Sequence, residues 1–119
     1  MPQVEAVIVL STWPADQDAG ATATTLVEER LAACVNLLPE MESVYRWKNA
    51  VERARERQLV IKTTRARVDA LLARLRQLHP YEVPEALVVP IVGGNDAYLA
   101  WLAKCTRGER VADALGPGR

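Results

Sequence analysis

The hydrophobic positions of this chain follow strand-like and helix-like periods in turn. Residues 4–12 contain a continuous apolar run, which is typical of a strand covered on both faces. The Trp-Pro pair that follows is expected to end this strand, because proline cannot donate to a ladder. Residues 21–33 carry apolar side chains three and four positions apart and predict a helix, with Asp16 or Asp18 offering an N-cap oxygen.

A second helix is predicted over residues 65–79, with Thr64 able to cap its start and Pro80 ending it. Its apolar stripe is the most regular in the chain: Val68, Leu71, Leu72, Leu75 and Leu78. A last strand is expected over residues 86–92, and Pro90 favours an edge position or a bulge there.

The stretch between the two helices, residues 33–64, predicts a long two-armed β-hairpin. Pro39 implies a bend or an edge position in the first arm, and residues 49–50 form the expected tip. The return arm begins with the charged run ERARER, which is expected to face solvent, and becomes an apolar strand over residues 58–64.

Alternation within this hairpin places bulky side chains on both of its faces: Val44, Arg46 and Lys48 on one, Tyr45 and Trp47 on the other. The stems of arginine and lysine are themselves partly apolar. A strand of this kind is usually covered on both faces. The chain has few elements to supply that cover, so the hairpin suggests contact with a second copy of the protein.

A short helix over residues 96–104, capped by Asn95, completes the expected elements and presents Tyr98, Leu99 and Leu102 on one side. The order strand, helix, strand, strand, helix, strand predicts an α+β fold of the ferredoxin-like (βαββαβ) kind. Such a fold has an antiparallel sheet with two helices on one face. The other face would be bare, which is a second reason to expect self-association.

Composition adds limits to this picture. A chain of 119 residues with 50% hydrophobic residues predicts a single domain, which we place at residues 1–107, with a loose tail at 108–119. Fifteen basic and fifteen acidic residues cancel, which argues against nucleic acid or an anionic membrane as a partner. The apolar run near the N-terminus is too short for a signal or membrane segment, so a cytoplasmic location is expected. Cys34 and Cys105 are expected to be free, buried thiols.

Catalytic patterns find little support in the sequence. His79 is the only histidine, and no serine lies in a GxSxG elbow, so the chain is not expected to be an enzyme. Glu82 and Glu85 lie in a proline-stiffened loop, where ordinary solvated carboxylates are more common than an acid–base pair. The Gly-Gly pair at residues 93–94 could cradle an anion before a helix, but such a pair more often forms a tight turn.

His79 and two tryptophans remain as candidates for function or assembly. A histidine that ends a helix can cap it or ligate a transition metal, and both readings stay open at this point. Trp101 is expected in the core. Trp47 is flanked by basic residues on a strand, where a pocket between subunits would shelter its ring.

Five motifs, in this order and spacing, resemble the CutA divalent-cation tolerance family: ERLAACVN (29–36), SVYRWKN (43–49), VIKTT (60–64), HPYEVPE (79–85) and YLAWL (98–102). The resemblance covers roughly residues 4–105. It implies a ferredoxin-like subunit in a tightly packed homotrimer similar to the PII signalling proteins. It also implies a cytosolic, non-enzymatic role in tolerance of divalent metals, copper especially.

The sequence departs from the family at the proposed copper ligands. These are a cysteine that closes the first strand and a His-His pair ahead of Pro-Tyr, and the matching positions hold Ser11, Leu78 and His79. His79 alone carries over. Loss of a thiolate and an imidazole removes most of the preference for copper, so the expected ligand is weakly bound Cu(II) or another divalent cation.

Three functions are consistent with these residues. The first is metal homeostasis by a homotrimer that binds a divalent cation weakly at His79. The second is a PII-like sensor with a small anionic metabolite in a cleft between subunits, lined by Tyr45, Trp47, Lys62, Tyr81, Glu82 and Pro84. The third is a rigid trimeric scaffold in which each hairpin covers the sheet edge of a neighbour.

Overall fold

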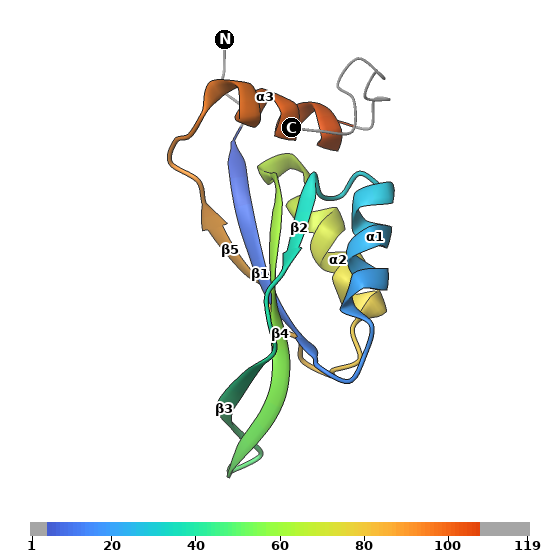
Figure 1. Ribbon diagram of the computed structural model, residues 1–119, viewed down its shortest axis with the longest axis vertical. Coiled ribbons are helices and arrows are strands. Elements are labelled where there is room, and N and C mark those ends of the chain that lie inside the picture. The colour runs from blue at the N-terminus through green and yellow to red at the C-terminus, as the bar shows by residue number, and fades with distance from the viewer. Residues whose placement is uncertain (1–4, 108–119) are drawn as a thin grey trace.

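The computed structural model describes residues 5–107 of the chain, and its elements follow the expected order (Figure 1). They are β1 (Ala6–Pro14), α1 (Ala19–Glu28), β2 (Cys34–Leu37), β3 (Met41–Trp47), β4 (Ala50–Thr64), a 3-10 turn (Arg65–Arg67), α2 (Val68–Leu78), β5 (Leu87–Pro90) and α3 (Asp96–Thr106). The predicted tail and the start of the first predicted strand lie outside the described residues.

A single antiparallel sheet organises the molecule around its longest strand, β4. Strand order is β2-β4-β1-β5, and β3 pairs with the first half of β4 beyond the end of β2. The β3–β4 hairpin therefore projects from the body of the sheet (Figure 1). The predicted hairpin is confirmed, but its turn lies at Lys48 and Asn49, one residue before the predicted tip. Pro39 marks the point where its first arm divides into two strands, β2 and β3.

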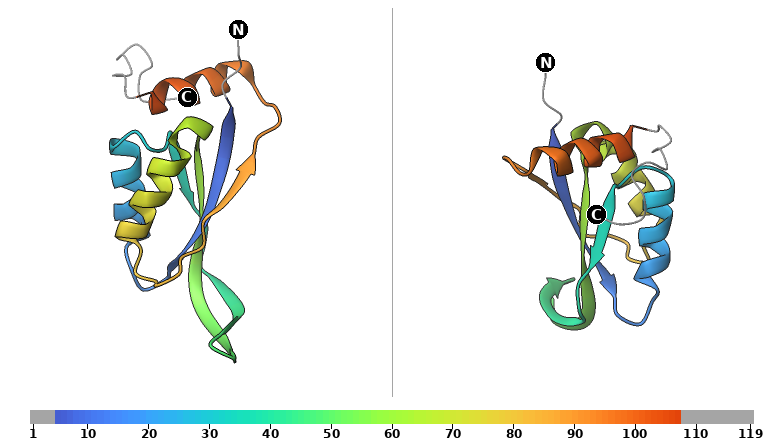
Figure 2. Two further views of the ribbon diagram at one scale, coloured as in Figure 1. Left: turned by 180° about the vertical axis from the view of Figure 1, so that it is seen from behind. Right: turned by 45° about the horizontal axis from the view of Figure 1, so that its top comes forward.

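Helices α1 and α2 cover one face of the sheet (Figures 1 and 2). The main core lies between these layers and includes Val9 and Ile61 from the sheet with Leu26, Leu71 and Leu75 from the helices. The apolar stripe predicted for the second helix is confirmed: Val68, Leu71 and Leu75 are buried, while Leu72 and Leu78 pack at the border of the core.

Helix α3 lies across one end of the sheet and forms a second, smaller core (Figure 2). Leu102 is its fully buried residue, packed with Ala6 and Ala33, and Tyr98 and Leu99 lie against them as predicted. Trp101 is half-buried, at a ring distance of 5.3 Å from Tyr98, so it lies at the edge of this core.

The face of the sheet opposite α1 and α2 keeps a partly uncovered apolar row. Ile8 and Leu10 of β1 alternate with core residues and lie beside Val89 and Leu87 of β5, respectively. Leu87 and Val89 are 55% and 41% exposed. Because α3 covers only one end of the sheet, this row remains accessible in a single chain.

The first helix ends at Glu28, five residues before the predicted end. Arg30 adopts a left-handed conformation with φ of 61°, which breaks the helix. The next residues lead into β2, since the Ala33 amide donates to the carbonyl of Lys62. Asp18 is the N-cap, and its side chain accepts from the amide of Ala21 at 3.1 Å.

Three other expectations differ from the structure. β1 was expected to end at residue 12 but continues through Pro14. Proline is tolerated there because β5 pairs with β1 only as far as Leu10, so the missing amide of Pro14 leaves no bond to β5 unmade. β5 ends at Pro90, and one further bond joins the Ile91 amide to the Ala6 carbonyl. The hydroxyl of Thr64 caps no helix; it lies 3.4 Å from the hydroxyl of Thr106.

Within residues 5–107, no helix is long and apolar enough to span a membrane.

Candidate functional site

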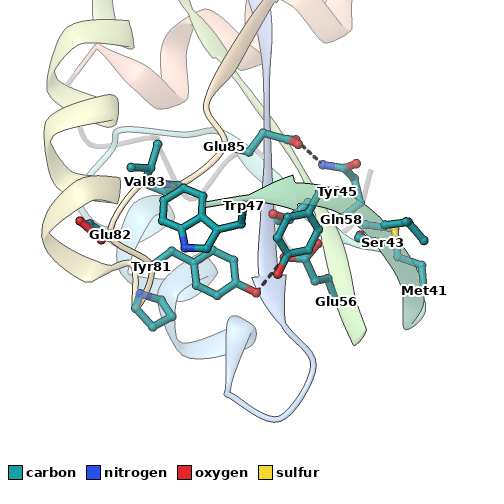
Figure 3. Close-up of a pocket in the computed structure, with 14 residues that line it drawn as sticks. Met41, Ser43, Tyr45, Trp47, Glu56, Gln58, Tyr81, Glu82, Val83 and Glu85 are labelled. Carbon is teal, nitrogen blue, oxygen red and sulfur yellow. Dashed lines mark hydrogen bonds between the residues drawn. The ribbon is translucent and has the colours of Figure 1, made fainter. Parts of the chain in front are cut away.

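The concave face of the β3–β4 hairpin and the loop that follows α2 enclose a pocket of about 760 Å³ (Figure 3). Its lining comes from four segments, which are the end of β1, strand β3 of the hairpin, the middle of β4 and the proline-rich loop. The lining residues are Thr12, Met41, Ser43, Val44, Tyr45, Trp47, Glu56, Gln58, Pro80, Tyr81, Glu82, Val83, Pro84 and Glu85.

A tight turn at Lys48 and Asn49 sets the shape of the hairpin. Both residues have positive φ, 50° and 67°, which matches the right-handed twist of two strands joined by a two-residue loop. Tyr45 pairs opposite Glu52, and Trp47 opposite Ala50. This register places both aromatic rings on the same face of the hairpin, where they line the pocket (Figure 3).

His79 anchors the other wall of the pocket to the sheet. Its Nε2 atom lies 2.6 Å from the carbonyl oxygen of Thr12, and its Nδ1 atom accepts from the amide of Tyr81 at 3.0 Å. These partners assign the neutral tautomer with the proton on Nε2. The ring is buried between Trp13 and Tyr81, with ring centroids at 4.3 and 4.8 Å.

Burial lowers the pKa of His79 below its usual value, although the Thr12 carbonyl and the charge of Glu56 act in the opposite direction. The imidazole is therefore a structural link between the sheet and the loop. Its ring does not bind the carbonyls that end α2, so the helix-capping reading applies only to its backbone amide, which donates to Leu75.

Tyr81 and Glu56 form the polar floor of the pocket. The Tyr81 hydroxyl donates to Glu56 Oε2 at 2.8 Å (Figure 3). Burial, with the adjacent Glu56 carboxylate as the next cause, strongly raises the pKa of Tyr81. Glu56 is only 5% exposed. The expectation that the whole ERARER run faces solvent was therefore wrong at Glu56, which alternates inward in register with Gln58.

Gln58 ties the far end of the loop to the sheet. Its side-chain amide donates to the carbonyl of Ser11 at 2.6 Å and to Glu85 Oε2 at 3.1 Å. Glu85 is thus held by a hydrogen bond, whereas Glu82 is exposed. Sequence reasoning missed both Glu56 and Gln58, and the available signal was the period-two spacing that continues from the apolar strand into the charged run.

The structure brings together five of the six residues predicted to line a cleft. Tyr45, Trp47, Tyr81, Glu82 and Pro84 all line the pocket, and they do so within one chain. Lys62 is not among the lining residues. Its ammonium lies 6.0 Å from the ring of Tyr98, at the α3 end of the sheet. A cleft between subunits stays a prediction.

The donor set for a metal ion is sparse. Residues 5–107 contain no group of three histidine, cysteine or acidic side chains placed to hold a metal. Both ring nitrogens of His79 already have partners, so a metal ion there would displace one of them. Ser11 is fully buried, and its hydroxyl has no hydrogen-bond partner in the described part of the chain. Leu78 packs against the core.

The two cysteines are free, as predicted, but half-buried. Burial raises the pKa of the Cys105 thiol, which makes it a poor nucleophile. At the start of α3, the side chain of Asn95 accepts from the amides of Ala97 and Tyr98 at 2.9 and 3.2 Å. This cap occupies the donors that an anion beside the Gly-Gly pair would need.

Residues 5–107 define a class of protein: a small α+β domain in which this range forms one antiparallel sheet, three α-helices and a projecting hairpin that closes an aromatic pocket. Residues 7–105 match the family described as CutA1 divalent ion tolerance protein, and the chain belongs to that family.

Relatives across bacteria and plants agree with this assignment. The Divalent-cation tolerance protein CutA of Pectobacterium atrosepticum is 46% identical, over 85% of this chain and 92% of its own length. The solved structure of the divalent cation tolerance protein from Thermus thermophilus superposes with a TM-score of 0.82 at 46% identity, covering 85% of this chain and 98% of that one. CutA1 from Oryza sativa superposes with a TM-score of 0.83 at 42% identity, covering 90% and 98%.

Proposed function

We propose that this protein contributes to divalent-cation tolerance as a non-enzymatic, cytoplasmic homotrimer. The observation that carries the proposal is the family match over residues 7–105, since two relatives that are 46% identical bear the name divalent-cation tolerance protein. The location is part of the proposal, because other relatives are named chloroplastic or periplasmic.

The trimer and the ferredoxin-like topology are finer parts of the same proposal. Strand order β2-β4-β1-β5 with α1 and α2 on one face is the order that a βαββαβ chain gives when each strand is antiparallel to its neighbours. The uncovered apolar row with Leu87 and Val89 supports association of copies, because such a row is costly to leave in water.

The residues present do not fit a tight copper site. A preference for copper needs a soft thiolate or several imidazoles. The three positions that match the family's proposed ligands, Ser11, Leu78 and His79, offer one imidazole with both nitrogens hydrogen-bonded. The proposal is therefore weak binding of Cu(II) or another divalent cation through His79, after release of either the Thr12 or the Tyr81 hydrogen bond.

Copper titration of the wild type, His79→Ala and Gln77→Ala tests this proposal. We expect weak binding by the wild type and by Gln77→Ala, an exposed neighbour on α2, and loss of that binding in His79→Ala. Identical binding by all three would refute the site. Growth of a deletion strain in excess copper, with and without the wild-type chain, tests the tolerance role separately; no rescue would refute it.

A second candidate function is a PII-like sensor of a small metabolite. The observation that favours it is the pocket, whose aromatic and polar lining exceeds what a packed core requires and whose volume is within the usual range for ligand sites. The anionic ligand expected from the sequence would rely on Lys62, so another subunit would have to supply that cation.

Without a ligand, the same trimer would be a structural scaffold. No thermal shift across a metabolite panel would argue for the scaffold.

A further inference from the structure

The charge of the pocket lining has one sign. Among residues 5–107, Glu56, Glu82 and Glu85 line the pocket, and no lysine or arginine does. Three arginines of β4 are engaged elsewhere. Arg53 pairs with Glu42, Arg55 pairs with Glu40, and Arg57 donates to the carbonyl of Leu38. An anionic ligand would therefore meet carboxylates without a compensating cation among the lining residues.

The aromatic part of the lining also favours positive charge. Tyr45, Trp47 and Tyr81 gather around the opening between hairpin and loop (Figure 3). The face of an aromatic ring attracts a cation through its quadrupole, and tryptophan does so most strongly. Trp47 already shows this behaviour, because the ammonium of Lys48 lies 5.7 Å from its ring centroid.

Glu56 is placed where a carboxylate attracts a cation effectively. It is nearly buried, so water screens its charge less than that of a surface glutamate. The Tyr81 hydroxyl binds its Oε2 atom and fixes the side chain in the pocket (Figure 3). A carboxylate held beside aromatic rings is the arrangement that recognises an ammonium group attached to an apolar body.

We propose that this pocket binds a small organic ammonium ion, with its charged head toward Glu56 and its apolar body against Trp47 and Tyr45. The inference rests on the second candidate function, a small-molecule site, and reverses the sign of the ligand charge expected from the sequence. The pocket of about 760 Å³ has room for a ligand larger than an isolated ammonium ion.

Three probes of similar size test the sign of the charge: benzylammonium, benzyl alcohol and benzoate. Binding is followed by NMR through the indole N–H of Trp47, which is assigned by its loss in Trp47→Phe. We expect benzylammonium to bind about tenfold more tightly than benzyl alcohol, and benzoate to bind most weakly. Added salt should weaken the binding of benzylammonium alone.

Two variants locate the charge. Glu56→Gln keeps an acceptor for Tyr81 and should weaken benzylammonium binding roughly three- to tenfold, with benzyl alcohol unchanged. Glu28→Gln removes an exposed carboxylate on α1, outside the pocket, and should leave both affinities unchanged. Thermal melting of each variant checks that it is folded.

The outcomes separate this inference from the function on which it rests. Equal or tighter binding of benzyl alcohol or benzoate at Trp47 would overturn the ammonium ion while supporting a small-molecule site. Equal weakening by Glu56→Gln and Glu28→Gln would overturn the role of Glu56. No shift of the Trp47 signal with any probe would overturn both the ammonium ion and the sensor, and copper tolerance would be unaffected.

Discussion

At the scale of single residues, His79 is the connection between the core and the pocket. Its two ring nitrogens join the Thr12 carbonyl of β1 to the Tyr81 amide of the loop, and Tyr81 in turn binds Glu56 of β4. Three segments distant in sequence are thus fixed to one another by two buried side chains, His79 and Glu56, and the half-buried Tyr81. Protonation of His79, or loss of the Tyr81 hydroxyl, should therefore lower the free energy of unfolding.

Stability should decrease as pH falls below the ordinary histidine pKa of about 6.5. Burial lowers the pKa of His79 in the folded chain, so the unfolded chain takes up the proton first. The stabilisation from the neutral ring is complete above this pH and is lost as pH falls toward the folded-state pKa. Urea unfolding between pH 5 and 7.5 measures the effect. A His79→Gln variant should show a flatter profile, and an unchanged profile would contradict the assignment.

Tyr81→Phe should destabilise the fold by about 1–2 kcal/mol, because it leaves the nearly buried carboxylate of Glu56 without its hydroxyl donor. Tyr45→Phe is the matched control, since Tyr45 is exposed in the same pocket. Its effect should stay within about 0.5 kcal/mol. Urea unfolding at pH 8 separates this loss from the titration of His79. If both substitutions lowered the free energy of unfolding equally, the hydrogen bond from Tyr81 to Glu56 would contribute no stability of its own.

At the scale of elements, the β3–β4 hairpin depends on its turn. Lys48 and Asn49 both adopt left-handed backbone conformations, which cost an ordinary residue about 1–2 kcal/mol, while asparagine tolerates them better. Strand β3, which leads into the turn, carries Tyr45 and Trp47. The turn therefore decides whether Tyr45 and Trp47 face the loop.

Asn49→Gly should be neutral or stabilising, and Asn49→Ala should cost about 1 kcal/mol, because glycine reaches positive φ without strain. Glu52→Ala, an exposed site in the adjoining strand, controls for effects of the substitution itself. Chemical denaturation compares the three variants. If Asn49→Ala were more stable than Asn49→Gly, the left-handed conformation of Asn49 would be refuted.

At the scale of the whole molecule, the apolar row on the open face of the sheet is the feature that a single chain leaves uncovered. Leu87 and Val89 lie on edge strand β5, opposite the helical layer, and are half-exposed. Copies that pack through this face would bury the row and cover the sheet edge together. Assembly would then use the open face of the sheet, whereas the pocket lies between the hairpin and the loop that follows α2.

The double variant Leu87→Glu/Val89→Glu should dissociate the proposed trimer, because it places charges at the apolar contact. Val27→Glu is the matched control. Val27 is 41% exposed, as is Val89, but lies on α1 in the opposite layer. Light scattering gives the masses. A double variant that remains trimeric would show that this face is not the interface.

Periodicity alone determined the elements and their order. The stripe from Val68 to Leu78 has the spacing of a helix with one buried face, and the apolar run through Val9 has that of a strand covered on both faces. Both elements are confirmed, because these side chains must be buried against another element wherever they fold. Boundaries were less accessible to sequence reasoning. The left-handed Arg30 ended α1 early, because the chain had to turn to pair Ala33 with β4, a constraint set by the sheet.

The candidate site was predictable only as a set of unusual residues. The motifs SVYRWKN and HPYEVPE singled out Tyr45, Trp47 and Tyr81, since a packed core would not require so many aromatic and charged side chains together. Tertiary structure decided the rest. Pairing of β3 with β4 placed Glu56 in the pocket and left Lys62 at the far end of the same strand, because one-dimensional spacing does not tell which stretch of a long strand meets which loop. The sign of the pocket charge follows from that placement.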